Sequence, residues 1–222
     1  MKKLFPLSLL VLFVLMLVSC GDKYYSTKDF TYVIENGGLS LVECNIDGPV
    51  DVTIVDVEEN GKKVLSIDDM VFYKSKTLES IYIPDTVKTV GDACFGYCSK
   101  LKSVRLSPSM YMITLRTFMY CTGLEEINIP EGIKMIESHA FSHCTALKNV
   151  VIPSSIKEID SSAFYLCSSM EYAFYAGTEE DWNKIKIQKY YNDNLLDNLY
   201  YYSETELSGN YWHYVDGVAT AW

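Results

Sequence analysis

The phrase Phe-x-x-Cys occurs four times, as Phe95-Gly-Tyr-Cys98, Phe118-Met-Tyr-Cys121, Phe141-Ser-His-Cys144 and Phe164-Tyr-Leu-Cys167. Consecutive cysteines in these phrases are 23 residues apart. A constant period in this range is typical of a solenoid, in which each copy of the repeat forms one coil of the chain. Solenoids usually present a surface to a partner and do not enclose a catalytic pocket. The repeat therefore predicts a fold class and favours a role in binding.

An apolar motif follows each cysteine and predicts a half-buried strand. Between Leu101 and Leu106 the motif ends in an alternation of apolar and polar residues, which is the pattern of a strand with one buried face. Proline ends most copies, because it cannot donate to a ladder. The apolar columns are Leu101, Leu124, Leu147 and Met170; Val104, Ile127, Val150 and Ala173; and Leu106, Ile129, Ile152 and Tyr175.

The Phe-x-x-Cys phrase is predicted to return the chain on the opposite side as a short helical or 3₁₀ turn. An earlier copy begins near Ile67, with Phe72 in the phenylalanine position and Ser75 in the cysteine position. No single copy can bury its apolar residues alone, so the copies must stack, with strands of successive coils paired in parallel. The predicted fold is an α/β repeat solenoid with parallel strands on one face, helical or 3₁₀ turns opposite, and β-rich caps.

One exposed column supports this register independently. The first outward position of the predicted strand alternates in charge from copy to copy, as Glu79, Lys102, Glu125, Lys148 and Glu171. In a parallel stack these side chains are neighbours, so each one faces opposite charges. A chance run on a solvated face is the alternative interpretation.

The motif C-x-x-L-x-x-I-x-I-P, followed by I-x-x-I-x-x-x-A-F, resembles the BspA-like leucine-rich repeat of bacterial surface proteins. The segment from Tyr175 to Ile185 and the aromatic tail from Tyr200 to Trp222 are similar to the end of such arrays. The resemblance covers roughly residues 30–222. It implies adhesion to proteins of a host or of a neighbouring cell.

The N-terminus has the pattern of an export signal. Met1-Lys2-Lys3 is a positively charged N-terminal region. Residues 4–18 are nearly all apolar, but they are fewer than a transmembrane helix usually needs. Ser19 directly precedes Cys20, as in a bacterial lipobox, so residues 1–19 are predicted to be a lipoprotein signal peptide and Cys20 the lipidated residue. The alternative is an ordinary cleaved signal before an unmodified Cys20. The predicted location is a bacterial membrane, at the cell surface and held by the lipid anchor.

The remainder divides into four predicted parts. Residues 20–29 form a tether, and residues 30–63 form an N-terminal cap with a degenerate first repeat. In that cap, Asn36-Gly37 between alternating runs predicts a hairpin. Repeats of 23 residues fill positions 64–177. Residues 178–222 form the C-terminal cap, which begins with a helix capped by Thr178.

Charge and cysteine usage exclude some partners and pairings. The chain has a net charge of −10, and removal of the signal peptide would make it more acidic. Such a chain repels phosphate backbones, so nucleic acid is not expected as a partner. Cys98, Cys121, Cys144 and Cys167 occupy one repeated slot for a small buried residue. They are expected to form a ladder of free thiols and not disulfides.

No catalytic constellation appears in the sequence. There is no glycine-rich phosphate loop and no G-x-S-x-G elbow, and the chain is predicted not to be an enzyme and to need no cofactor. His139 and His143 are four residues apart, a spacing that can bind metal on a regular helix. His143 occupies a variable repeat position, so a surface residue is the favoured interpretation and no metal site is predicted.

The outward positions of the strands are the candidate binding surface. The predicted residues of this surface are Tyr82, Arg105, Asn128, Val151 and Phe174 from one column and Tyr172 from the next. An apolar group beside charges is typical of a protein contact, and a C-terminal cap folded over Tyr172 and Phe174 is the alternative. The expected function is a cell-surface binding module for a host or envelope protein. An envelope scaffold or a glycan-binding accessory lipoprotein is the second hypothesis.

Overall fold

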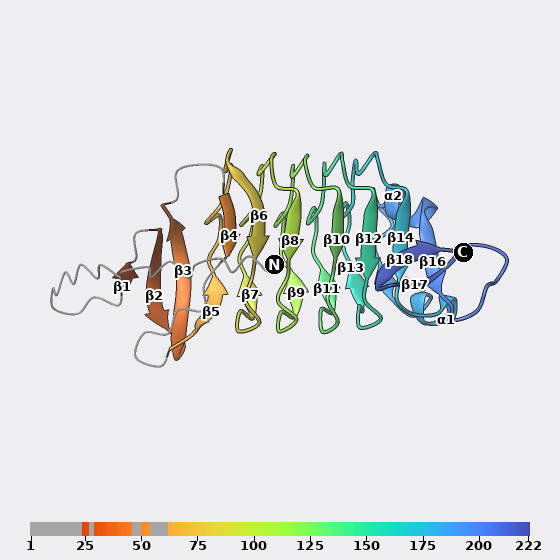
Figure 1. The fold of residues 1–222 in the computed structure, drawn as a ribbon, viewed down its shortest axis with the longest axis horizontal. Coiled ribbons are helices and arrows are strands. Elements are labelled where there is room, and N and C mark those ends of the chain that lie inside the picture. Colours follow the sequence, from red (N-terminus) through yellow and green to blue (C-terminus); the bar gives the residue numbers. More distant parts are fainter. Residues whose placement is uncertain (1–23, 27–28, 46–49, 54–61) are drawn as a thin grey trace, which may run out of the picture.

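The chain forms an elongated solenoid with a cap at each end (Figure 1). The structure is a computed structural model and describes residues 24–26, 29–45, 50–53 and 62–222. The predicted signal peptide, Cys20 and most of the predicted tether lie outside these residues. Within the described residues, no helix is long and apolar enough to cross a membrane.

The motif L-x-x-I-x-I forms the predicted strands, which lie on one face of the solenoid in two sheets. One sheet has β4 (Val50–Thr53), β6 (Leu78–Tyr82) and β8 (Ser103–Arg105) paired in parallel. The other has β10 (Glu126–Asn128), β12 (Asn149–Ile152), β14 (Tyr172–Tyr175) and β16 (Leu199–Tyr202) paired in parallel. Ile81 pairs with Val104, and Ile127 pairs with Val150. Each of these partners lies one repeat further along the chain, which confirms the predicted register.

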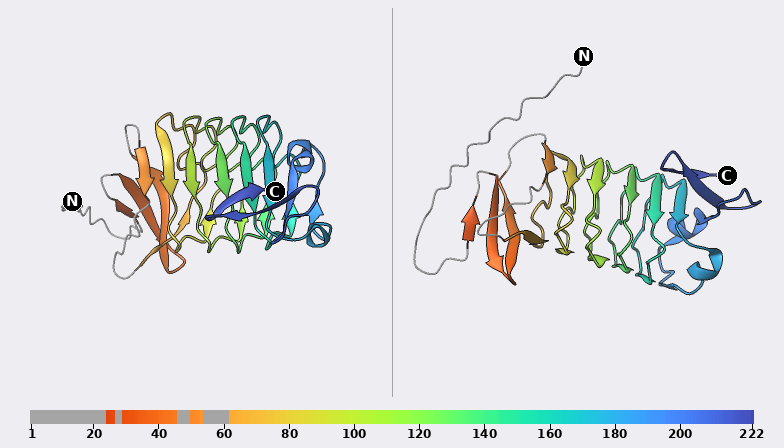
Figure 2. Two further views of the ribbon diagram at one scale, coloured as in Figure 1. Left: turned by 45° about the vertical axis from the view of Figure 1, so that its right-hand side comes forward. Right: turned by 60° about the horizontal axis from the view of Figure 1, so that its bottom comes forward.

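A second ladder, which the sequence analysis did not assign, runs beside the first (Figure 2). Its first part is β5 (Val64–Ile67) and β7 (Thr89–Val90), paired in parallel. Its second part is a separate sheet of β9 (Met112–Ile113), β11 (Met135–Ile136), β13 (Glu158–Ile159) and β15 (Lys186–Ile187), also paired in parallel. Ile113 and Ile136 are fully buried. Each regular coil therefore contributes two short strands and one return to the core.

The predicted helical or 3₁₀ returns are not confirmed, and the α/β description is corrected accordingly. Within the described residues the α-helices are α1 (Glu179–Trp182) and α2 (Asp193–Asp197), and both lie in the C-terminal cap. The returns are successive turns that contain left-handed residues, for example Tyr97 (φ 62°) and Tyr120 (φ 61°), and a right-handed helix cannot pass through such residues. The N–H of Phe95 donates to the carbonyl of Thr117 in the next coil, at 2.9 Å. The returns thus form a third ladder between coils.

The repeated phenylalanines form a continuous stack through the core. The rings of Phe72, Phe95, Phe118, Phe141 and Phe164 follow one another at centroid distances of 5.2, 5.2, 5.3 and 5.1 Å. The last four of these side chains are fully buried. The stack shows that equivalent residues of successive coils lie on top of one another.

The repeated cysteines are buried beside this stack as free thiols. Each thiol donates to the carbonyl of the phenylalanine of the coil before it: Cys98 to Phe72, Cys121 to Phe95, Cys144 to Phe118 and Cys167 to Phe141, at 3.0, 3.1, 3.1 and 3.2 Å. The cysteine column therefore bonds each coil to its neighbour.

Alkaline solution is expected to destabilise the fold through this column. Burial raises the pKa of the Cys98 and Cys167 thiols from 9.0 to about 12. Between these values the unfolded chain loses protons that the folded chain keeps, so stability present below pH 9 is lost as the pH rises toward 12. Urea unfolding at pH 8, 9 and 10 should show a smaller loss for Cys98→Ser/Cys167→Ser than for the unchanged chain. Equal losses in the two proteins would contradict this role of the thiols.

The caps close both ends of the core. At the N-terminal end, β2 (Phe30–Glu35) and β3 (Gly38–Cys44) form the predicted hairpin around Asn36 (φ 48°) and Gly37 (φ 83°). Strand β1 (Tyr24–Ser26) pairs antiparallel with β2 and lies inside the segment predicted as a tether.

The C-terminal cap extends the strand face of the array. Thr178 caps α1 as predicted, since its hydroxyl accepts from the N–H of Asp181 at 3.2 Å. Strand β16 pairs in parallel with β14, and β17 (Tyr211–Val215) pairs in parallel with β16. Strand β18 (Val218–Ala221) completes an antiparallel hairpin with β17.

Candidate binding surface

The strand face brings most of the predicted surface residues into one exposed row. Tyr82 pairs with Arg105, and Asn128 pairs with Val151, in the register of the parallel strands. Tyr82, Arg105 and Asn128 are exposed, and Val151 is half-buried. We call these four residues the strand-face row. Their exposure follows from the alternation of the strands, whose other positions point into the core.

Arg105 is held in one position by its neighbours. Its guanidinium carbon lies 4.7 Å from the centroid of the Tyr82 ring. Its Nη1 donates to the carbonyl of Ile83 at 2.9 Å and also forms an ion pair with Asp85. Tyrosine and arginine are the residue types enriched at energetic centres of protein interfaces. Because this pair is already ordered, a partner that binds it loses less side-chain entropy.

A hollow of about 240 Å³ adjoins the same arginine. Its lining consists of Val104, Arg105, Leu106, Pro108, Asn128 and Pro130. The hollow is smaller than the roughly 300–1,000 Å³ of a typical small-molecule site. Its size and mostly apolar lining suit one side chain of a protein partner.

The charge column lies next to the row and forms some of the predicted pairs. Lys102 is 3.1 Å from Glu79, and Lys148 is 3.3 Å from Glu125. All four side chains are well exposed, so each pair contributes at most about 1 kcal/mol. These pairs are evidence for the register of the strands, but they contribute little to the stability of the fold.

Phe174 does not belong to the exposed surface, which corrects the prediction for that residue, whereas Tyr172 is half-buried, as Val151 is. Phe174 is only 3% exposed and lies 5.3 Å from the ring of Trp212. The indole Nε1 of Trp212 donates to the carbonyl of Tyr175 at 2.7 Å, which fixes the cap over this position. The ring of Tyr172 is half-buried and stacks on Phe174 at 5.2 Å. The alternative that the cap covers the predicted residues is therefore correct for Phe174.

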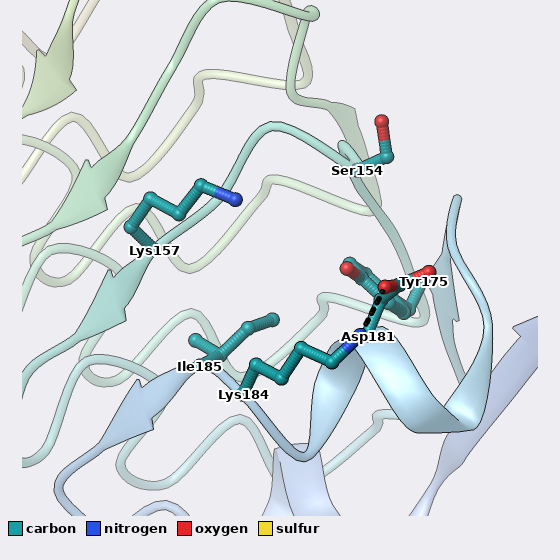
Figure 3. Close-up of a pocket in the computed structure, with 6 residues that line it drawn as sticks. All are labelled: Ser154, Lys157, Tyr175, Asp181, Lys184 and Ile185. Atoms are coloured by element: carbon teal, nitrogen blue, oxygen red, sulfur yellow. Dashed lines mark hydrogen bonds and ion pairs between the residues drawn. The ribbon is translucent and has the colours of Figure 1, made fainter.

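A second hollow, of about 100 Å³, lies where α1 meets the array (Figure 3). Ser154, Lys157 and Tyr175 contribute from the array, and Asp181, Lys184 and Ile185 contribute from α1 and the residues after it. Lys184 forms ion pairs with Asp181 at 3.1 Å and Glu180 at 3.0 Å. Burial, and then the charge of Asp181, raise the pKa of Tyr175, so the phenol is not activated. The hollow therefore lies at the packing contact between the cap and the array.

The histidines take part in aromatic contacts. The His143 ring stacks on Tyr120 at 4.1 Å and meets the edge of Tyr165 at 5.4 Å. It belongs to a column of rings on the return face: Tyr73, Tyr97, Tyr120, His143, Tyr165 and Tyr191. Burial lowers the pKa of His139. In the part of the chain that the structure describes, no group of three or more His, Cys, Asp or Glu side chains could hold a metal ion.

Sequence reasoning missed the aromatic column, although a signal was present. Tyr97, Tyr120 and His143 each stand two residues after the repeated phenylalanine. Tyr73 and Tyr165 stand one residue after it, and their rings reach the same column. The rings of Tyr97, Tyr120 and His143 stack on one another between coils, so the column packs the coils together.

Comparisons with known proteins agree with the solenoid. Residues 57–171 match the model of the BspA type leucine rich repeat region, in six copies. That count exceeds the five copies recognised from the phenylalanine phrase. No curated protein matches the chain.

Solved structures of bacterial proteins share the architecture. A leucine rich cell surface protein from Faecalibacterium prausnitzii A2-165 is 28% identical, with a TM-score of 0.68, over 74% of this chain and 42% of that one. The leucine rich repeat protein TpLRR of T. pallidum is 25% identical, with a TM-score of 0.63, over 72% of this chain and 79% of that one. The pneumococcal vaccine antigen PcpA shares the fold at 16% identity and a TM-score of 0.56.

This chain spans less than half of the Faecalibacterium protein that it matches. The family match, in contrast, covers more than half of this chain and includes its repeated core. The chain belongs to the BspA type leucine rich repeat family.

Proposed function

We propose that this chain is a non-enzymatic binding module that is anchored by a lipid at Cys20 to a bacterial membrane and displayed at the cell surface. Its partner is a protein of a host cell or of the cell envelope, and it docks on the strand-face row of Tyr82, Arg105, Asn128 and Val151. Membership of a family with cell-surface relatives supports the location.

The ordered pair of Arg105 and Tyr82 is the observation that carries this proposal. The pair combines a cation and an aromatic ring on a rigid sheet, beside a hollow that suits one apolar side chain. Central anchors of this kind, surrounded by polar residues, are the usual organisation of a protein interface.

A glycan partner is less well supported. Sugars bind to the open faces of aromatic rings, and each aromatic ring among the predicted surface residues has at least one face covered. Phe174 is buried beneath Trp212, and Tyr172 stacks on Phe174. Tyr82 has Arg105 over one face of its ring. The proposed partner is therefore a protein.

Site-specific photocrosslinking on intact cells tests the proposal. A photoreactive phenylalanine analogue is placed in the full chain at Asn128, and a matched chain carries it at Thr122. Both positions are exposed and belong to the same coil, but Thr122 lies on the return side. The proposal predicts a protease-sensitive adduct from position 128 at a yield at least about tenfold above that from position 122.

Equal yields from the two positions would contradict a partner on the strand face. An adduct that resists proteases but is removed by glycosidases would favour the glycan hypothesis instead. Protease treatment of the same intact cells should also release the array. Protection from protease would argue against display at the surface.

A further inference from the structure

Strand β18 is a free edge of the sheet. Within the described residues it is the last strand in the order β10-β12-β14-β16-β17-β18, and it pairs with β17 alone. Strand β17 pairs with β16 only through Tyr211 and Trp212. The hairpin of β17 and β18 therefore extends beyond the array, as the right-hand view of Figure 2 shows.

The edge of β18 presents unpaired backbone groups. The N–H of Trp222 donates to the carbonyl of Tyr211 at 3.1 Å, which makes this a hydrogen-bonded pair of the hairpin. In an antiparallel ladder such pairs alternate with non-hydrogen-bonded ones. Val218 and Thr220 thus bond to β17, whereas Ala219 and Ala221 direct their N–H and C=O groups away from it.

The side chains of this short, four-residue edge do not block pairing. Natural edge strands carry charges, prolines or bulges that block further strands. Residues 218–221 are Val-Ala-Thr-Ala, without a charge or a proline, and the pairing with β17 runs without a register shift. Backbone groups that face outward from a regular strand are matched by the backbone of another extended strand.

The outward face of the hairpin carries two large apolar side chains, Val218 and Trp222, beside the polar Thr220 and His213. Trp212 points toward the array and is fully buried. Side chains alternate along a strand, so Ala219 and Ala221, which lie on the same face as Trp212, are on the array side. Val218, Thr220 and Trp222 are on the outer face, where Val218 is 65% and Trp222 40% exposed. The Trp222 ring stacks on His213 at 3.6 Å, and its Nε1 donates to the carbonyl of Ser203 at 3.3 Å.

We propose that β18 pairs antiparallel with β18 of a second copy of this chain, about a two-fold axis at Thr220. In this register the outward groups of Ala219 meet those of Ala221 of the second copy. Thr220 faces Thr220, and Val218 faces Trp222 of the second copy. Thr–Thr pairs and pairs of an aromatic with a β-branched residue are among the favourable cross-strand neighbours.

This register is self-complementary, so a second copy meets the geometric requirement for the occupant. A two-fold interface requires each patch to match itself, and the four residues of β18 with Trp222 do so without placing like charges opposite each other. The proposed dimer uses the C-terminal hairpin and leaves the strand-face row of Arg105 and its neighbours to a different partner. It therefore does not depend on the proposed function.

Disulfide crosslinking of the full chain, purified in detergent, tests the dimer. Residues that face each other in a non-hydrogen-bonded pair have Cβ atoms about 4.5–5.5 Å apart, close to the distance that a disulfide requires. Thr220→Cys is therefore expected to form a disulfide-linked dimer under mild oxidation. The matched control is Leu207→Cys, which lies between β16 and β17 and is 46% exposed. The dimer predicts a rate at least about tenfold higher for position 220, because pairing raises the effective thiol concentration.

A second substitution separates pairing from chance collision. Val218→Glu in the Thr220→Cys chain removes the contact with Trp222 of the second copy. In the single chain the introduced glutamate side chain stays in water, because position 218 is exposed. It should lower the crosslinking rate of Thr220→Cys toward that of the control. The same oxidation of the unchanged chain measures any crosslinking through the native cysteines. Equal rates at positions 220 and 207, or a Thr220→Cys adduct with a different protein in intact cells, would overturn the proposal.

Discussion

Replacement of Phe118 by alanine is expected to lower the free energy of unfolding by about 3–5 kcal/mol, the usual range for a buried phenylalanine. Phe118 is fully buried between Phe95 and Phe141, at centroid distances of 5.2 and 5.3 Å. Its removal leaves a cavity between two coils, and the ladders above and below prevent the coils from closing it. The loss is a large share of the roughly 5–15 kcal/mol that stabilises a folded domain.

Urea unfolding followed by circular dichroism measures this loss. The matched control is Tyr120→Ala in the same coil, where the ring is half-buried in the outer aromatic column and stacks on Tyr97 and His143. Each stacked contact of this kind is worth about 0.5–1.5 kcal/mol, so the control should lose less than Phe118→Ala. A smaller loss for Phe118→Ala than for Tyr120→Ala would show that the phenylalanine stack is not the core.

The parts of the fold that depend on equivalent positions of the repeat could be predicted from the sequence. A constant spacing predicts which residues share a column, and alternation within the strand predicts which side each one faces. Leu101 and Val104 are therefore correctly placed toward the core, and Tyr82, Arg105 and Asn128 are correctly placed outside. Hydrophobic burial enforces these assignments in every copy, so a single chain displays them several times.

The backbone conformation of the returns, in contrast, could not be predicted from the repeated sequence. The left-handed positions are occupied by residues such as Tyr97, Tyr120 and His143, and not by the glycine or asparagine that signals such a backbone. Bonds between neighbouring coils hold these residues there. The second ladder was missed because strands such as β9 and β11 have only two residues each, which is too short for an alternation to appear.

The candidate surface was predicted only where it depends on the repeat. Phe174 has the outward position of its strand, yet Trp212 covers it. That contact joins residues far apart in the chain and belongs to the cap, which has no repeated counterpart. The ion pair of Arg105 with Asp85 likewise depends on the path of the loop after β6. A contact that occurs only once in the fold produces no repeated spacing, so it cannot be recognised in a single sequence.

A deletion of one whole repeat is expected to leave a folded protein, whereas a deletion one residue shorter is expected to abolish the fold. Removal of residues 127–149, which are 23 residues, joins Glu126 to Val150. Val150 then takes the buried position of Ile127, because the two residues pair in register. Each coil contacts only its neighbours in a solenoid, so the shortened array closes with one interface fewer.

Removal of residues 127–148 instead joins Glu126 to Asn149. The amide of Asn149 then takes the core position, and Val150 and Ile152 turn toward water, because a shift of one residue exchanges the two faces of a strand. Each apolar side chain moved into water costs about 1.5–3 kcal/mol, and the buried amide adds about 1–3 kcal/mol. Together these costs approach the whole stability of a domain.

Thermal unfolding of this matched pair tests directly whether successive coils stack with equivalent residues in register. Stacking in register predicts a β-type circular dichroism spectrum and a cooperative transition for the chain that lacks residues 127–149. It predicts no cooperative transition for the chain that lacks residues 127–148. If the two chains unfold alike, equivalent residues do not lie on top of one another, and the exposed strand-face row does not exist as described.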